Sequence, residues 1–232
     1  MRTFSISILS VCLLAVAFTS CGKLGRALGS EDVSMDSEEV AAKVKELVTK
    51  HVDASKWKIY EITWYENEEL GNDLGGMKLT MINKDNKYYT QTIRQNNTKE
   101  YVVDELEEPI MPKSVRAEIM FDQVVGIDFN KLDGKLIAKQ LEEAKALIPA
   151  EYEFKSVASY TIEEEVKKIG KMDKLSPKKG NDDNKYGKQT VSFELNALKQ
   201  GEGKEMKGRQ IITNYYPISY SVQEDGSVKI DE

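Results

Sequence analysis

The sequence predicts an α+β fold built from helices and an antiparallel sheet. Residues 37–51 and 134–148 carry apolar side chains at the three- and four-residue spacing of amphipathic helices. Most other segments are short runs of alternating apolar and polar residues, separated by Gly, Asn and Asp residues that favour tight turns. Each helical segment precedes about four such runs. We therefore expect two units, each with the element order α-β-β-β-β. This repeated order favours a tandem duplication whose two copies pack together.

The first unit begins with a helix whose start is marked by Asp36. Together with Glu39, three residues later, Asp36 resembles a capping box, in which side chains accept hydrogen bonds from free backbone N–H groups. The apolar stripe of this helix consists of Val40, Val44, Leu47 and Val48. Turn residues then separate four expected strands, at residues 57–65, 77–81, 88–94 and 101–106.

The second unit contains one helix and the remaining strands. Asp133 is expected to cap the helix at residues 134–148, and Pro149 ends it because proline cannot continue a helix. Residues 115–125 are a candidate strand ahead of this helix. Further strands are expected at residues 152–162, 190–195, 211–216, 218–222 and 228–230.

Composition divides the chain into four parts. A signal segment at residues 1–20 and a tether at residues 21–35 precede the two units, at residues 36–110 and 111–232. The boundary between the units falls at residues 107–113, where two prolines interrupt the strand pattern. A unit of about 75 residues buries only a modest core. We therefore expect the two units to behave as one body or as two tightly apposed domains.

Charge and cysteine content narrow the classes of function. The formal net charge is −6, so the chain lacks the basic surface that binding to nucleic-acid phosphates needs. It contains two cysteines, Cys12 and Cys21, and Cys12 lies within the signal segment. Once that segment is removed, Cys21 has no second thiol for a disulfide, a redox motif or a cysteine metal site.

The N-terminal segment has the pattern of a secretion signal. Residues 6–18 form an apolar run of thirteen residues, which is too short for the roughly 20 residues of a membrane-spanning helix. The sequence Phe18-Thr19-Ser20-Cys21 then resembles the lipobox of bacterial lipoproteins, in the form typical of Bacteroidetes. That resemblance implies a diacylglyceryl group on Cys21, cleavage after Ser20 and acylation of the new amine. Several acyl chains anchor a protein stably in a lipid bilayer. The alternative is an ordinary cleaved signal with an incidental cysteine.

The tether predicts where the folded part lies. Residues 22–35 are rich in glycine and polar side chains, and a flexible coil of this length reaches about 20 Å. Surface-displayed lipoproteins of the Bacteroidetes type carry acidic residues directly after the cysteine, whereas this chain has Lys23 and Arg26. By that resemblance we expect a cell-envelope protein anchored in the outer membrane and facing the periplasm.

A search for catalytic and metal-ligating residues yields few candidates. The single histidine, His51, ends the first predicted helix, where an imidazole interacts favourably with the helix dipole. Carboxylates of the runs Glu163–Glu165 and Glu66–Glu69 leave open a hydrolase of the glycosidase kind, which needs two converging carboxylates. Residues 181–184 offer oxygen ligands but lack the spacing of a calcium loop. We therefore expect no catalytic residue, metal or cofactor.

Aromatic side chains are the strongest remaining signal for binding. Strand alternation places Tyr60 and Trp64 on one side of the strand at residues 57–65, and Trp57 and Tyr65 on the other. One side is expected to pack on the helix, and the other could present contact area to a partner. We select Trp64 and Tyr60 as candidate residues for a ligand or partner. The alternative is that both sides are buried between the units.

The order of one helix followed by a strand meander is similar to PepSY and β-lactamase-inhibitor-like modules of bacterial envelope proteins. The similarity is one of pattern, and it transfers no functional residue. We expect a non-enzymatic, membrane-anchored envelope lipoprotein that binds an envelope protein or a ligand through a sheet face. Two alternatives are a carbohydrate-active or other hydrolase that uses carboxylates and a PepSY-like periplasmic inhibitor or chaperone module.

Overall fold

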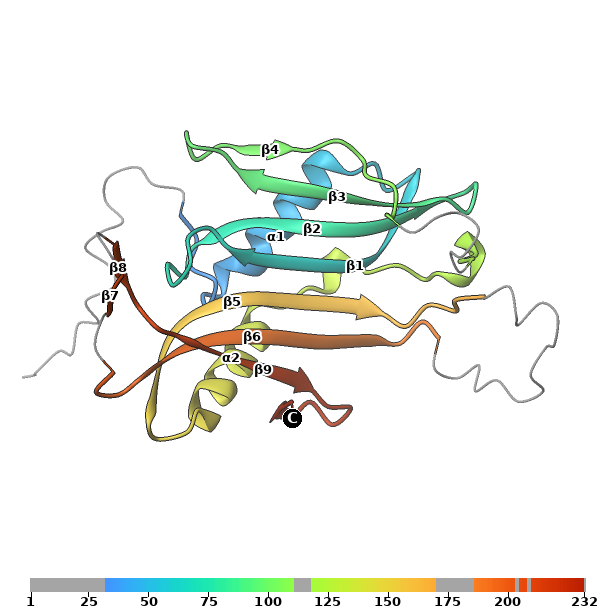
Figure 1. Cartoon of the computed structure of the whole chain (residues 1–232). Coiled ribbons are helices and arrows are strands. Elements are labelled where there is room, and N and C mark those ends of the chain that lie inside the picture. The colour runs from blue at the N-terminus through green and yellow to red at the C-terminus, as the bar shows by residue number, and fades with distance from the viewer. Residues whose placement is uncertain (1–31, 111–117, 170–185, 203–204, 208–209, 232) are drawn as a thin grey trace, which may run out of the picture. The chain divides into compact units, whose positions relative to one another are not determined.

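The computed structural model describes residues 32–110, 118–169, 186–202, 205–207 and 210–231 (Figure 1). Asp32–Glu232 form one compact unit. Its described part contains two α-helices and an antiparallel sheet of eight strands, which confirms the predicted α+β class. Cys21 with its tether, and the loop at residues 181–184, lie outside the described residues.

Elements of both halves lie close to their predicted positions. The first half consists of α1 (Glu39–His51), β1 (Trp57–Glu66), β2 (Leu74–Asn83), β3 (Tyr88–Gln95) and β4 (Tyr101–Val103). The second half contributes α2 (Gly134–Leu147), β5 (Tyr152–Glu164), β6 (Gln189–Lys199), β9 (Tyr216–Val222) and β10 (Val228–Ile230). Two short strands, β7 (Glu205–Lys207) and β8 (Gln210–Ile212), form a separate antiparallel pair.

Strands β1 and β5 join the two halves at the centre of the sheet. The strand order is β10-β9-β6-β5-β1-β2-β3-β4, so each half contributes four neighbouring strands. The two central strands run antiparallel, with Glu61 opposite Glu163 and Tyr65 opposite Ser159. A single sheet therefore continues across the boundary between the halves, and the two halves share one hydrophobic core.

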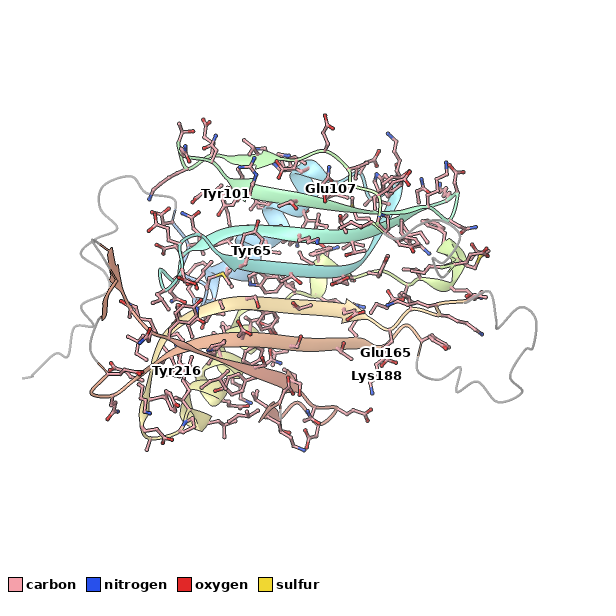
Figure 2. The ribbon with its side chains drawn as sticks, viewed as in Figure 1. Tyr65, Tyr101, Glu107, Glu165, Lys188 and Tyr216 are labelled. Atoms are coloured by element: carbon pink, nitrogen blue, oxygen red, sulfur yellow. The ribbon has the colours of Figure 1, made fainter. Side chains whose placement is uncertain are left out.

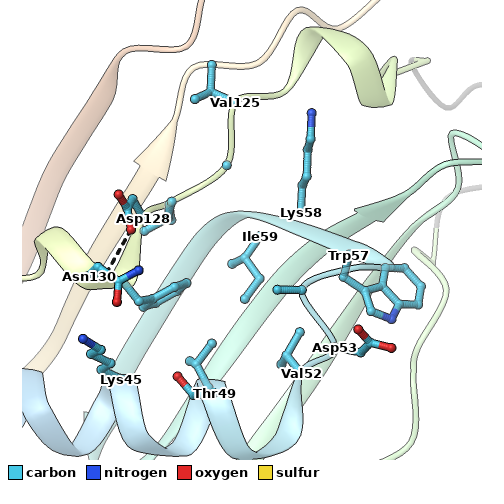
Figure 3. Close-up of a pocket in the computed structure, with 15 residues that line it drawn as sticks. Lys45, Thr49, Val52, Asp53, Trp57, Lys58, Ile59, Val125, Asp128 and Asn130 are labelled. Carbon is cyan, nitrogen blue, oxygen red and sulfur yellow. Dashed lines mark hydrogen bonds between the residues drawn. The ribbon is translucent and has the colours of Figure 1, made fainter.

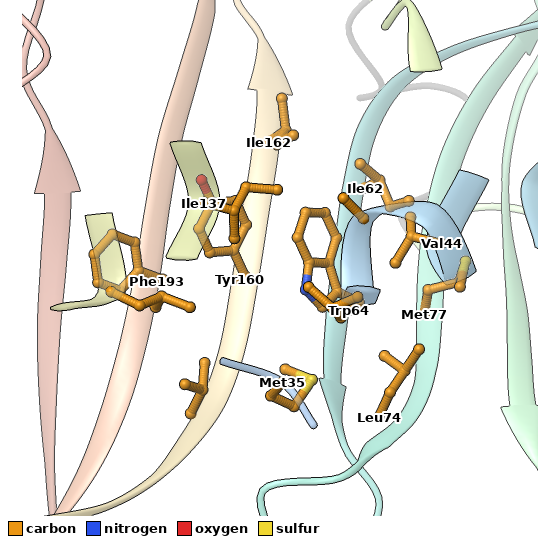
Figure 4. Close-up of a cluster of buried hydrophobic side chains, with 14 of the residues drawn as sticks. Met35, Val44, Ile62, Trp64, Leu74, Met77, Ile137, Tyr160, Ile162 and Phe193 are labelled. Atoms are coloured by element: carbon orange, nitrogen blue, oxygen red, sulfur yellow. The ribbon is translucent and has the colours of Figure 1, made fainter. Parts of the chain in front are cut away.

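The main core lies between the sheet and the two helices, which pack on the same face (Figure 1). Its centre is a stack of four rings in register across β1, β5, β6 and β9, and Figure 4 shows three of them, those of Trp64, Tyr160 and Phe193. Successive centroids are 4.6, 5.5 and 5.4 Å apart. Stacked aromatic pairs contribute about 0.5–1.5 kcal/mol beyond the burial of their surface. The rings belong to Trp64, Tyr160, Phe193 and Tyr220, each at most 3% exposed.

A bulge in β1 separates Tyr60 from Trp64. The pairing of β1 with β2 shifts register between Ile59 and Glu61, which adds one residue to β1. As a result Ile59 and Trp64 both face the main core, whereas Tyr60 belongs to a second apolar cluster with Ile82, Ile119, Val124 and Val166. The prediction that Tyr60 and Trp64 share a side is therefore wrong. Trp57, predicted to share a side with Tyr65, instead packs against the main core.

Two local predictions are also wrong, and a third is confirmed. Asp36 does not cap α1: its carboxylate accepts hydrogen bonds from Ser34 and Asn72 and pairs with Lys145, and these three partners lower its pKa despite the opposing effect of burial. The candidate strand at residues 115–125 contains no strand within its described residues, which form a bridge at Glu118 and a 3-10 turn. Asp133 caps α2 as expected, because it accepts hydrogen bonds from the N–H groups of Lys135 and Leu136.

The strand expected at residues 211–216 is interrupted. β8 ends at Ile212 and β9 begins at Tyr216, and the residues between them belong to no strand. Pro217 lies within β9, opposite Asn196 of β6, beyond the stretch of β9 that pairs with β10. Among the described residues, this part of β9 therefore has no strand partner on its outer side, and a missing N–H there removes no ladder hydrogen bond.

Residues 125–127, in the chain that links the halves, cross the sheet at one end, and we call them the crossing segment. Residues 57–60 of β1 do not pair with β5, and the linking chain passes beside them, where the N–H of Ile127 donates to the Ile59 carbonyl at 2.8 Å. Gly126 adopts a φ of +90°, which favours glycine. The buried carboxylate of Glu164 accepts hydrogen bonds from the N–H groups of Val125 and Gly126, at 2.8 and 2.6 Å. These contacts hold the crossing in place.

Candidate functional site

The candidate site is the sheet face opposite α1 and α2, which we call the open face. Within the described residues no α-helix lies on it, although the second apolar cluster covers one end through Ile119, Val124 and the 3-10 turn between them. Its side chains alternate with those that face the main core. They fall into three rows that cross neighbouring strands, as the pairing register shows. Figure 2 labels Tyr65, which belongs to one of these rows. Because opposite residues in an antiparallel sheet point to the same face, the pairing register defines each row.

The middle row is dominated by hydroxyl groups, and we call it the hydroxyl row. Two of its threonines, on the central strands, bond to each other, with Thr63 Oγ1 and Thr161 Oγ1 2.8 Å apart. Each hydroxyl can both donate and accept a hydrogen bond. From β9 to β3 the row consists of Ser221, Ser192, Thr161, Thr63, Lys78 and Thr92.

A second row, the carboxylate row, places two acidic side chains next to each other. Glu61 and Glu163 are direct cross-strand partners on β1 and β5, and both are half-buried. Like charges directly opposite each other destabilise a sheet. The Glu61 carboxylate accepts a hydrogen bond from Thr80 Oγ1 at 2.9 Å. The whole row is Thr190, Glu163, Glu61, Thr80 and Thr90.

Tyr65 is the largest side chain of the third row, the tyrosine row. A Cβ atom added at Gly76, its partner on β2, would lie 2.9 Å from the Tyr65 hydroxyl, so the ring reaches over this glycine. Burial is the main cause of the raised pKa of Tyr65. The negative charge of Asp104 adds to this increase, and the positive charge of Arg94 opposes it. The row consists of Ser219, Glu194, Ser159, Tyr65, Gly76 and Arg94.

Neither of the two aromatic residues selected from the sequence is exposed on the open face. Trp64 is fully buried against the helices, and Tyr60 is 4% exposed beneath the second apolar cluster. Neither presents contact area to a partner in this structure. A signal for the correct side was present in β1, because Tyr65 alternates with the polar residues Glu61 and Thr63, whereas Trp64 alternates with Ile62.

The carboxylates considered for hydrolysis serve different contacts. Glu66 accepts hydrogen bonds from the N–H groups of Leu70 and Asn72 and from the Asn196 amide, so it organises the β1–β2 loop. Glu69 accepts a hydrogen bond from the Tyr215 hydroxyl at the surface. Glu164 binds the crossing segment, and Glu163 faces Glu61 on the open face. The structure therefore brings together Glu61 and Glu163, a pair that the sequence runs did not identify.

Neither metal ligands nor a membrane helix emerges from the described part of the chain. No group of three or more His, Cys, Asp or Glu side chains in that part is arranged to hold a metal ion. Among the same residues, no helix has the length and apolar character needed to cross a bilayer. Comparisons of the chain with protein-family models, with curated proteins and with solved structures give no match.

Proposed function

We propose that this chain is a non-enzymatic cell-envelope lipoprotein that binds a partner protein through the open face. The observation that carries the proposal is the one-sided arrangement of the sheet. Both helices cover one face, while the other presents the three ordered rows described above, the hydroxyl, carboxylate and tyrosine rows. Serine and threonine lose little side-chain freedom when a partner orders them, compared with long side chains such as lysine.

The carboxylate row indicates the chemistry of the partner. Glu61 and Glu163 repel each other at the centre of the sheet, and a lysine or arginine placed between them would relieve that repulsion. The neighbouring hydroxyl row can bond to backbone or side-chain amides. We therefore favour a partner surface that presents one basic side chain among polar groups.

The pairing of the halves also supports a duplication, which we propose as the origin of the fold. Each half has one helix followed by four strands in the main sheet, and the first strand of each half lies at its centre. The two copies would thus be related by an approximate two-fold rotation about the β1–β5 pair. A PepSY-like or β-lactamase-inhibitor-like inhibitor or chaperone module remains the alternative proposal, and it would use the same open face.

The open face is tested by a pair of matched arginine substitutions. Ser192→Arg adds a long charged side chain to the hydroxyl row, whereas Ala146→Arg adds the same side chain to an exposed position of α2. We expect residues 22–232, used as bait against envelope extracts, to recover a partner that Ala146→Arg retains and Ser192→Arg loses by at least tenfold. Equal recovery by both variants, with unchanged folding by circular dichroism, would refute this face as the binding surface.

Lipid anchoring is a separate prediction of the same proposal. Acylated Cys21 would hold the compact unit to the outer membrane, facing the periplasm. We expect Cys21→Ala to move the protein from the membrane fraction to the soluble fraction of fractionated cells, because no acyl chain is attached. Ser20→Thr keeps Cys21 and serves as a control that still partitions with membranes. A Cys21→Ala protein that remains membrane-bound contradicts the anchor.

A further inference from the structure

A pocket lies beside the crossing segment, on the side of the sheet that carries the helices (Figure 3). It is bounded by the C-terminal half of α1, the start of β1 and residues 125–130, and its volume is about 740 Å³. Pockets for small organic ligands have volumes of about 300–1,000 Å³. Its apolar walls are formed by Val48, Val52, Trp57, Ile59, Ile127 and Phe129.

The walls of this pocket are fixed by hydrogen bonds that need no ligand. Ile127 bonds to the carbonyl of Ile59, and Glu164 holds the two residues ahead of it. Trp57 packs edge-on against Tyr89, with their centroids 5.6 Å apart. The apolar surface is therefore held open, and a ligand does not have to order it on binding.

Most of the charged groups around the pocket already have partners. Asp53 accepts hydrogen bonds from Ser55 and pairs with Lys56. The Lys58 ammonium donates to the carbonyls of Phe121 and Val124, at 3.0 and 2.6 Å. Asp53 and Lys58 therefore stabilise the fold through these intramolecular bonds.

Two hydrogen-bond donors at the pocket, the side chains of Asn130 and Lys45, differ from Asp53 and Lys58 because they have no intramolecular partner among the described residues. The backbone N–H of Asn130 donates to the Asp128 carboxylate, and among the described residues the Asn130 side-chain amide makes no intramolecular hydrogen bond. In the same part of the chain, the exposed ammonium of Lys45 makes neither an ion pair nor a hydrogen bond. Figure 3 shows Lys45 and Asn130 at the same end of the pocket.

We propose that this pocket binds an amphipathic carboxylate, whose apolar tail lies between Val52, Trp57 and Phe129 and whose carboxylate meets Lys45 and Asn130. An ammonium and an amide N–H are both donors to carboxylate oxygens, and a charge-assisted bond is about twice as strong as a neutral one. The apolar walls supply the larger part of the affinity, and Lys45 supplies the selection for the anion. This site is independent of the open face.

The probes are octanoate and decanoate, titrated below their micelle concentrations into residues 22–232 by calorimetry. This segment contains the whole compact unit. We expect saturable binding, with decanoate about fifteenfold tighter than octanoate because two more methylenes are buried. Tryptophan emission should change on binding, since Trp57 lines the pocket while Trp64 is fully buried, and Trp57→Phe should abolish that change.

Four variants and a neutral ligand separate this site from non-specific binding. Lys45→Gln should weaken decanoate at least tenfold and leave decanol unchanged, whereas Lys50→Gln, an exposed lysine on the same helix outside the pocket, should change neither. Asn130→Ala should weaken decanoate more than decanol. Thr49→Phe, at an exposed pocket position on α1, should weaken both ligands by filling the space. The proposal is overturned by absence of saturable binding, by equal effects of Lys45→Gln and Lys50→Gln, or by unchanged affinity in Thr49→Phe.

Discussion

Trp64→Ala is expected to lower the free energy of unfolding by about 3–5 kcal/mol, the range typical of large aromatic residues truncated in a core. Trp64 is fully buried, and its ring stacks on Tyr160 with centroids 4.6 Å apart. Its removal leaves a cavity at the centre of the sheet, between the two halves, where backbone on both sides limits collapse. Urea denaturation followed by far-ultraviolet circular dichroism measures the loss.

The matched control is Trp57→Ala, at the other tryptophan of the chain. Trp57 is partly exposed at the edge of the core, so its truncation should lower stability by less than that of Trp64. Trp64→Phe, which keeps a ring in the stack, should fall between wild type and Trp64→Ala. If Trp64→Ala unfolded at the same urea concentration as wild type, the ring stack would not be a source of stability.

Glu164→Ala should lower the free energy of unfolding by about 3 kcal/mol. The fully buried Glu164 carboxylate is the acceptor for the N–H groups of Val125 and Gly126, and a hydrogen bond to a charged group contributes about 1.5–3 kcal/mol. The crossing segment should then loosen, and hydrogen exchange at these two N–H groups should accelerate more than exchange in α2. Thermal or urea unfolding gives the magnitude of the effect.

The neighbouring residue Glu163 provides the control. Its side chain lies on the open face opposite Glu61, so Glu163→Gln removes a like-charge contact and leaves the crossing segment untouched. We expect unchanged or slightly higher stability from Glu163→Gln. Equal losses from both substitutions, or no loss from Glu164→Ala, would show that Glu164 does not hold the crossing segment.

Local pattern was sufficient to predict the helices and most of the strands. The helical spacing around Leu141 and the side chain of Asp133 determine α2 and its start, because both effects act within a few residues. Aromatic and β-branched composition identified β1, and alternation identified β2. Asp36 illustrates the limit: its carboxylate has the position of a cap, yet its partners Asn72 and Lys145 are distant in the sequence.

Residues of the candidate site were harder to predict than the elements that carry them. The bulge beside Tyr60 reverses the side to which the first residues of β1 point, and it results from pairing with β2 rather than from a signal in β1. The pocket beside Trp57 has a similar origin, since it needs the chain near Ile127 to enter between strands that are far apart in the sequence.

The sequence by itself determined the fold class, the position of most elements and the expectation of a lipid anchor at Cys21, because each depends on neighbouring residues. Only the tertiary structure decided which face of the sheet is open. That choice follows from the antiparallel pairing of β1 with β5, which places Trp64 against both helices and aligns Glu61 with Glu163 on the other side. Such pairings join residues about 100 positions apart and minimise exposed apolar surface over the whole fold, so no local window of sequence contains them.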